Sequence, residues 1–150
     1  MVKVMTEYKT IKVQYTPEGR RFKLRKAENS DWIDLYTERN ETIYVGEYKA
    51  ISLGVAIELP KGYEAIVASR SSTFKHWGLL PVNGIGVIDN SFKGKNDIWH
   101  YLAFATKDVT IPAGTRLCQF RIIRNQPAFK IEETFDLTDE NRGGIGSTGR

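Results

Sequence analysis

Short runs rich in valine, isoleucine, tyrosine and phenylalanine recur along the chain, and within them apolar and polar residues partly alternate. Such runs are typical of β-strands. No long stretch keeps the period of an amphipathic helix, although residues 71–78 predict one helical turn after a serine cap. The pattern predicts an all-β protein with strands at 10–16, 51–60, 63–69, 97–106 and 117–123.

Three Pro-x-Gly triplets separate these runs, at residues 17–19, 60–62 and 112–114. Proline presets the backbone for a turn, and glycine permits a positive φ angle. Many short strands with turns between them favour a β-sandwich, a jelly roll or a barrel.

The length of 150 residues suits one domain with its own core. Hydrophobic residues make up 41% of the chain and charged residues 27%, and the two kinds are interleaved, as in globular proteins. The net charge of +4 fits a polyanionic partner and a small anionic ligand equally well. Because no basic run accompanies this charge, we expect no nucleic-acid partner. No signal peptide or membrane-spanning stretch is evident, so we expect a cytoplasmic protein without a membrane partner.

Cysteine and histidine are scarce: Cys118 is the only cysteine, and His76 and His100 are the only histidines. This set allows neither an internal disulfide nor a thiolate zinc site. A metal that takes part would be a hard ion on oxygen ligands, such as Mg²⁺.

The end of the chain, NRGGIGSTGR at residues 141–150, contains four glycines and one apolar side chain. Such a segment buries too little apolar surface to offset the entropy of ordering its backbone. We expect a folded domain over residues 1–135 and a flexible, glycine-rich arm over residues 136–150. Taken alone, the arm is either a frayed chain end or a functional segment.

The stretch PVNGIGVIDNSFKGKND, residues 81–97, is the most informative for chemistry and predicts a β-hairpin. Asp89 closes an otherwise apolar strand there, and a carboxylate in that place needs partners. One interpretation is a turn aspartate that caps its own backbone. The other is a ligand site, because the neighbouring glycines let backbone amides approach a flat base.

Two further stretches contain arginine beside small polar residues. SRSS, residues 69–72, follows a predicted strand and offers Arg70 and two hydroxyls to a phosphate or a carboxylate. GTRLCQF, residues 114–120, places Arg116 and Gln119 at the start of a strand. Taken alone, the first stretch is more often a solvated turn than a ligand site, and Arg116 is more often a surface ion-pair partner than a ligand.

In this order, the stretches resemble the motifs of the trimeric dUTPase family, and the resemblance covers residues 24–149. SDWIDLY at 30–36 is similar to the first motif, SRSS to the second, NGIGVIDNSFKG to the third, GTRLCQF to the fourth and GGIGSTG to the fifth. The resemblance implies a jelly-roll-like β-clip subunit in a homotrimer, with sites at the subunit boundaries and the arm of another subunit as a lid. It also implies hydrolysis of dUTP to dUMP and pyrophosphate, which keeps uracil out of DNA and supplies dUMP for dTMP synthesis.

The resemblance also implies roles for individual residues. Asp89 would orient or deprotonate the water that attacks the α-phosphorus, and Mg²⁺ would be held mainly by the phosphates and by water, without a direct protein ligand. Asn83 and the backbone after it would contact uracil, and Phe92 would pack against the deoxyribose. The substrate-binding residues would be Arg70, Ser71, Ser72, Asn83, Gly86, Ile88, Phe92, Asp97, Gln119, Arg142, Gly144, Ile145, Ser147 and Thr148, with Asp34 and Arg116 in support.

The arm departs from the family pattern at two positions. Ile145 replaces the aromatic residue that caps the uracil, and Glu140 stands where the family has an arginine. Arg142 or Arg150 is the candidate cation for the γ-phosphate, and another aromatic residue such as Phe92 is the candidate cap.

Two alternatives to a dUTPase remain open on the sequence. A dCTP deaminase shares the fold but needs a glutamate after the hairpin, and there is none between Glu64 and Glu132. A noncatalytic regulatory protein on the same scaffold is the other alternative.

Overall fold

The computed structural model describes residues 7–149, which form eleven strands, one short α-helix and one turn of 3₁₀ helix. This content confirms the predicted all-β fold. The N-terminal strands are Lys12–Tyr15 (β1), Ile33–Tyr36 (β2), Glu41–Ile43 (β3), Tyr48–Ser52 (β4), Val55–Glu58 (β5) and Tyr63–Ser69 (β6). The remaining elements are η1 (Gly19–Arg21), α1 (Thr73–Trp77), β7 (Leu79–Pro81), β8 (Gly86–Ile88), β9 (His100–Ala105), β10 (Val109–Ile111) and β11 (Arg116–Arg124).

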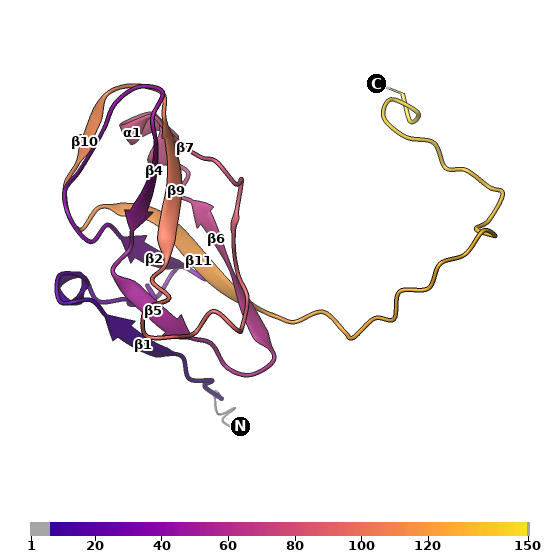
Figure 1. Cartoon of the computed structure of the whole chain (residues 1–150), viewed down its shortest axis with the longest axis horizontal. Helices are drawn as coiled ribbons and strands as arrows, with labels where there is room; N and C mark the ends of the chain where they lie inside the picture. The colour runs from indigo at the N-terminus through magenta and orange to yellow at the C-terminus, as the bar shows by residue number, and fades with distance from the viewer. Residues whose placement is uncertain (1–6, 150) are drawn as a thin grey trace, which may run out of the picture.

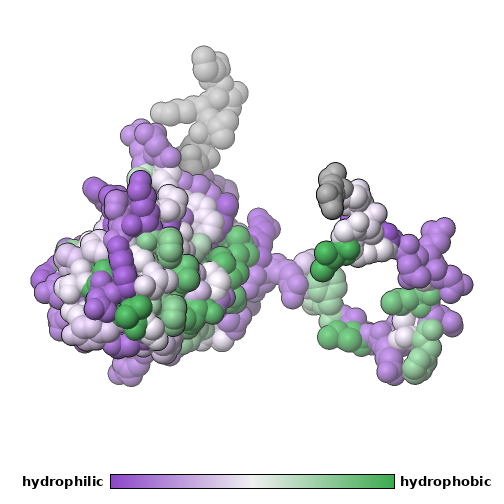
Figure 2. All heavy atoms as spheres, turned by 90° about the horizontal axis from the view of Figure 1, so that it is seen from above, coloured by the Kyte–Doolittle hydropathy of each residue, from purple (hydrophilic) through white to green (hydrophobic). Residues whose placement is uncertain are grey.

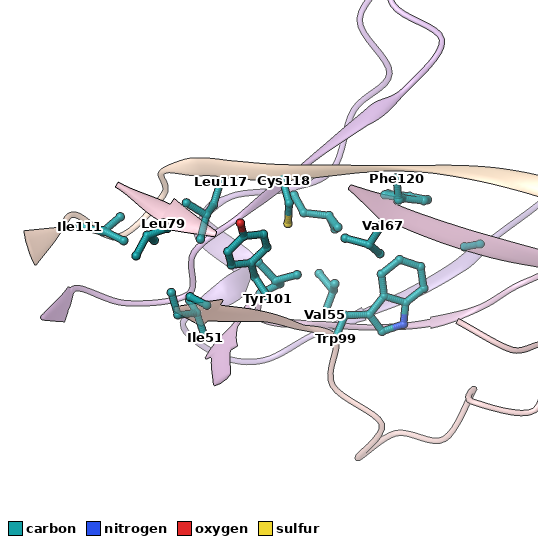
Figure 3. Packing of buried hydrophobic residues seen from close by; sticks show 14 of the residues in the cluster. Ile51, Val55, Val67, Leu79, Trp99, Tyr101, Ile111, Leu117, Cys118 and Phe120 are labelled. Atoms are coloured by element: carbon teal, nitrogen blue, oxygen red, sulfur yellow. The ribbon is translucent and has the colours of Figure 1, made fainter. Parts of the chain in front are cut away.

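The strands pair antiparallel in four sheets, in the orders β1-β5, β10-β3, β2-β11-β6-β8 and β4-β9-β7 (Figure 1). The core lies between the two larger sheets. Figure 3 shows Cys118 and Phe120 of β11 on one side of this core and Trp99 and Tyr101 on the other. The Trp99 and Phe120 rings meet edge to face, with centroids 5.2 Å apart, a favoured aromatic geometry. The core thereby fixes β9 against β11.

Each of the five predicted runs contains a strand, but the run at 51–60 is split between β4 and β5. Gly54, at φ +67°, lies in the break, and the backbone of Gly19 packs directly against it. A Cβ on Gly19 would lie 2.4 Å from the Gly54 carbonyl oxygen. Gly19 is therefore required for the close approach of two backbone segments and not for a positive φ angle. Gly62 and Gly114, in the other two Pro-x-Gly triplets, have the expected positive φ angle.

The predicted hairpin at 81–97 is wrong, because its two strands do not pair with each other. Its two strands, β7 and β8, flank the turn at 82–85 but belong to different sheets: β7 pairs with β9, and β8 pairs with β6. The stretch therefore crosses between the two larger sheets at their open edge. This crossing places the residues that follow β8 beside the start of β9.

The predicted helical turn is present as α1, but the serine cap is wrong. Ser72 precedes the helix with helical backbone angles, and its side chain makes no capping hydrogen bond. The Thr73 hydroxyl instead donates to the Leu117 carbonyl at 2.7 Å. This bond ties α1 to β11, next to the candidate arginines.

The chain leaves the sheets after β11. The amide of Asn125 donates to the Gly62 carbonyl at 2.9 Å, and beyond it residues 126–149 extend away from the body of the protein (Figure 1). Apolar and polar residues both occur along this extension (Figure 2). Among the described residues, no helix is long and apolar enough to cross a membrane.

Cys118 should be almost unreactive in the folded protein. Its side chain is fully buried, and this burial, together with nearby Asp34, raises the pKa of the thiol well above its usual range. Because only the thiolate attacks a disulfide reagent, we expect Ellman's reagent at pH 8 to label the native protein at least about 10²-fold more slowly than the urea-unfolded protein. Rapid labelling of the native protein would contradict the burial of this thiol.

Candidate active site

A pocket of about 370 Å³ opens where the crossing after β8 meets β9. The two elements come from different sheets, so the pocket occupies the open edge between them. Its lining includes five predicted site residues, namely Asn83, Gly86, Ile88, Asp89 and Phe92. The structure therefore brings together the residues assigned to the base, the sugar and the attacking water.

Asp89 lies at the exposed end of β8, where it accepts a hydrogen bond from the Ser91 hydroxyl. This bond, with the backbone amides of Ser91 and Asn90, lowers the pKa of the Asp89 carboxyl. Part of the turn interpretation is thus correct, since Asp89 does cap its own backbone. The carboxylate nevertheless lines the pocket, so the two interpretations are compatible.

The pH at which activity is lost on the acid side should depend on Ser91. A base acts in its ionised form, so activity that depends on Asp89 is present above its pKa and is lost as the pH falls through that pKa. Ser91→Ala removes the donor that lowers this pKa, so we expect the Asp89 pKa to rise towards its ordinary value and the acid limb to move to higher pH. NMR titration of the Asp89 carboxyl in both proteins measures the shift, and identical titration curves would contradict it.

Phe92 is only partly covered, with 39% of its surface exposed, so it does not belong to the core. The pocket also contains residues that the motifs did not indicate, notably Ser91, Trp99 and His100. Ser91 had a usable signal, because a turn aspartate commonly accepts a hydrogen bond from the backbone two residues on, which brings that residue beside the carboxylate. Trp99 and His100 had no such signal, because they lie just before β9 and at its first position, far from the motif along the chain.

Trp99 and His100 differ in their surroundings. Trp99 is buried, and its indole N–H has no hydrogen-bond partner within the described part of the chain. His100 is exposed, and its Nδ1 lies 2.8 Å from the Ile98 carbonyl oxygen, which orients the ring.

A second set of predicted residues meets at one end of the sheet β2-β11-β6. Asp34 pairs with Arg70 (Nε to Oδ1, 3.4 Å) and with Arg116 (Nη1 to Oδ2, 3.6 Å). Arg70 also donates to the Arg116 carbonyl at 3.2 Å. Two guanidinium groups share one carboxylate, so this arginine cluster (Asp34, Arg70 and Arg116) has a net positive charge. Such a cluster can attract phosphate oxygens and is poorly suited to a bare metal cation.

A β-bulge places Arg116 in this cluster. β11 pairs Arg116 with Tyr36 but Cys118 with Leu35, so one extra residue interrupts the register, and both Leu117 and Cys118 are buried. The bulge puts Arg116 on the face of the sheet that holds Asp34. Gln119 is the direct cross-strand neighbour of Asp34 and therefore lies on the same face.

The other predicted residues lie elsewhere. Ser71 and Ser72 stand between Arg70 and α1, with Ser71 exposed and Ser72 partly buried. Asp97 accepts the Gly94 amide at 2.8 Å, which closes the turn before β9, and does not line the pocket. The arm residues Arg142, Gly144, Ile145, Ser147 and Thr148 are exposed, whereas Arg150 lies outside the described residues.

Neither arginine of the cluster lines the pocket around Asp89. Across residues 7–149, no group of three or more His, Cys, Asp or Glu side chains is placed to hold a metal ion. Within one chain, the predicted site residues therefore form two separate sets, one suited to a nucleoside and a water molecule and the other to phosphate.

Comparison with known proteins agrees with this chemistry. The family model for dUTPase matches residues 23–149. The chain is 47% identical over 139 residues to the SPbeta prophage-derived deoxyuridine 5'-triphosphate nucleotidohydrolase YosS of Bacillus subtilis, covering 93% of this chain and 97% of that protein.

Solved structures share the fold. A mutant dUTPase of phage phi11 of S. aureus, described with a structural Mg(II) ion, matches with a TM-score of 0.71 and 19% identity over 86% of this chain and all of that one. The Staphylococcus bacteriophage 80alpha dUTPase with dUPNHPP matches with a TM-score of 0.74 and 18% identity over 95% of this chain and all of that one. The family match and the Bacillus relative, together with the ordered motifs, place this chain in the dUTPase family.

Proposed function

We propose that the protein is a dUTP diphosphatase, which hydrolyses dUTP to dUMP and pyrophosphate. The observation that carries the proposal is the convergence of Asn83, Asp89 and Phe92 on one pocket. Asn83 and the β8 backbone would read the edge of uracil, and Phe92 would pack against the deoxyribose. Asp89, ionised at neutral pH, would orient the water that attacks the α-phosphorus and accept its proton.

The lowered pKa of Asp89 limits its strength as a base. A carboxylate whose pKa is lowered is a weak base, so alignment of the water contributes more than full removal of its proton. The arginine cluster, with Gln119 beside it, would stabilise the negative charge on the phosphates as the bond to the leaving pyrophosphate breaks. Positioning and charge stabilisation would then supply most of the catalysis.

We further propose a homotrimer in which each complete site is built from more than one chain. The separation of the Asp89 pocket from the arginine cluster supports this assembly, because a single chain does not join the two sets. The glycine-rich arm of another subunit would cover the triphosphate with the amides of residues 143–148.

Magnesium fits this site as an ion that arrives with the substrate. The cluster's net positive charge favours the triphosphate, whose oxygens are the hard ligands that Mg²⁺ prefers. Gln119 would lie near the α-phosphate or a metal-bound water. When bound, the ion would neutralise phosphate charge, while Arg70 and Arg116 orient the same phosphates.

A pyrophosphate-release assay tests the activity. With Mg²⁺ present, we expect turnover of dUTP well above that of dCTP, dTTP or UTP. A parallel ammonia assay with dCTP tests the deaminase alternative. Ammonia from dCTP without pyrophosphate from dUTP would overturn the proposed function.

Phe92→Ala should relax the choice of sugar. The substitution removes the ring proposed to lie against C2′ of the deoxyribose, so UTP would gain room for its 2′-hydroxyl. We expect the ratio of kcat/KM for dUTP to that for UTP to fall by about 10-fold to 100-fold. Phe74→Ala, at an exposed phenylalanine that does not line the pocket, is the matched control. An unchanged ratio in Phe92→Ala would remove Phe92 from sugar selection.

A further inference from the structure

Tyr101 is a buried tyrosine of β9 that lies outside all five motifs. Its hydroxyl oxygen is 2.7 Å from the hydroxyl oxygen of Ser69, the last residue of β6. Only 3% of the Tyr101 surface is exposed. Figure 3 shows its hydroxyl directed toward the side of the core that holds Cys118, the cross-strand partner of Ser69. The bond therefore links the sheet β4-β9-β7 to the sheet β2-β11-β6-β8 through the interior.

Ser69 directly precedes Arg70 of the arginine cluster. On the other side of Arg70, the hydroxyl of the buried Thr73 donates to the Leu117 carbonyl at 2.7 Å. The Thr73 amide also donates to the Arg70 carbonyl at 3.1 Å, which closes the backbone of residues 70–72 into a turn. This arginine turn (residues 70–72) is thus held at both ends by side-chain hydroxyls that bond to other elements.

The contacts within the arginine cluster do not by themselves fix Arg70. Its Nε lies 3.4 Å from Asp34, and Arg116 approaches the same carboxylate at 3.6 Å. All three side chains are partly exposed, and ion pairs in contact with water contribute little to stability. The place of the Arg70 guanidinium therefore depends on where its backbone is held.

The strand that carries Tyr101 also borders the pocket around Asp89. Trp99 and His100, which directly precede Tyr101, line that pocket. The backbone of Tyr101 pairs with Ile51 of β4, which fixes this part of β9 within its sheet. Within one chain, Tyr101 therefore connects the pocket wall to the arginine turn.

Stability alone does not call for a tyrosine at this position. A phenylalanine would fill nearly the same volume and would need no hydrogen-bond partner, whereas a buried hydroxyl must find one. Burial raises the pKa of Tyr101, although the bond to Ser69 opposes this shift, so the hydroxyl stays protonated at neutral pH. The bond is therefore present under the conditions in which the Asp89 carboxylate is ionised.

We infer that Tyr101 is a positioning residue, which acts through Ser69 to hold Arg70 where its guanidinium meets the phosphates. The inference rests on the proposed function for the identity of the substrate. A displacement of about 1 Å in a positioning contact is enough to slow a reaction severely. Loss of one anchor of the arginine turn should therefore reduce catalysis without removing any group that contacts the substrate.

Tyr101→Phe tests the anchor, because it removes the hydroxyl and keeps the ring. Tyr15→Phe is the matched control, since the Tyr15 hydroxyl accepts the Leu24 amide at 2.8 Å and does not line the pocket around Asp89. We expect Tyr101→Phe to lower kcat/KM for dUTP by about tenfold, and Tyr15→Phe to be near normal. Affinity for deoxyuridine, which has no phosphate, should be unchanged in both. A Tyr101→Phe protein as active as the control, or an equal loss of deoxyuridine affinity, would overturn the inference.

A double variant separates positioning from a general effect on the fold. If Tyr101 acts through Arg70, adding Tyr101→Phe to Arg70→Ala should cause no further loss of kcat/KM. If the two residues act independently, the two losses multiply in the double variant. Multiplied losses would contradict the inference.

NMR relaxation of the backbone amides tests the same link without substrate. In Tyr101→Phe, we expect lower order parameters at Ser71 and Ser72 than in the unmodified protein, and unchanged values at residues 89–92. Unchanged order parameters in the arginine turn would also reject the role of Tyr101. A loosened turn in a protein that does not hydrolyse dUTP would reject the proposed function alone.

Discussion

Asp89→Asn is expected to lower kcat for dUTP by about 10²-fold to 10⁴-fold, the range typical for loss of a positioned general base. The amide keeps the shape of the carboxylate but cannot accept the proton of the attacking water. Substrate binding should change much less, because the proposed contacts to uracil, the deoxyribose and the phosphates come from residues other than Asp89. Pre-steady-state turnover measures the chemical step, and titration with a non-hydrolysable dUTP analogue measures binding.

Asp108→Asn is the matched control for this substitution. Asp108 is an exposed aspartate that accepts the Val45 amide at 2.8 Å in the turn before β10, and it does not line the pocket. We expect near-normal turnover from this variant. If Asp89→Asn also kept turnover within about tenfold of the unmodified protein, Asp89 would not act as the base.

Deletion of residues 141–150 is expected to leave a folded trimer with almost no activity. The residues removed up to 149 are exposed and contribute no side chain to the core. Loss of the amides proposed to hold the triphosphate, together with loss of water exclusion, should lower kcat/KM by about 10²-fold or more. Circular dichroism and light scattering check the fold and the assembly of the truncated protein.

Mixing experiments test whether the arm acts between subunits. Truncated protein mixed with full-length Asp89→Asn, under conditions of subunit exchange, should regain part of the activity. In some mixed trimers, an intact Asp89 and an intact arm would meet in one site. A mixture of truncated protein with truncated Asp89→Asn has no arms and serves as the control. If mass spectrometry confirms exchange and no activity returns, the arm does not act on a neighbouring subunit's site.

The sequence carried the family-level conclusion because the motifs are local. The order of SRSS, NGIGVIDNSFKG and GTRLCQF can be read without knowing which strands pair. The strand-forming character of each run is also local, since it depends on side-chain type and alternation. The exposure of the arm is local in the same way, because a glycine-rich segment has little apolar surface to bury.

Pairing across the chain was decided only by the tertiary structure. The prediction of a hairpin at 81–97 failed because β7 pairs with β9 and β8 pairs with β6, in two different sheets. The alternation of residues within a strand does not indicate which other strand it pairs with. The same crossing places the pocket beside the start of β9, so that Trp99 and His100 line it. Gly19 likewise has its role through contact with Gly54, a residue distant in sequence.

The sequence by itself determined which chemical groups are present: one candidate base, the two arginines of the second and fourth motifs, an asparagine proposed to contact uracil, and a glycine-rich arm. The tertiary structure decided which groups meet. Asp34 binds Arg70 and Arg116 because β11 lies between β2 and β6 and contains a bulge, and Asp89 lies apart from them at the edge between two sheets. The alignment of Tyr48, Phe104 and Leu80 across β4, β9 and β7 likewise follows from strand register, because only pairing brings them into one row. Side-chain chemistry is a property of each residue, whereas proximity depends on long-range pairing, and a function that needs both is complete only in the folded chain.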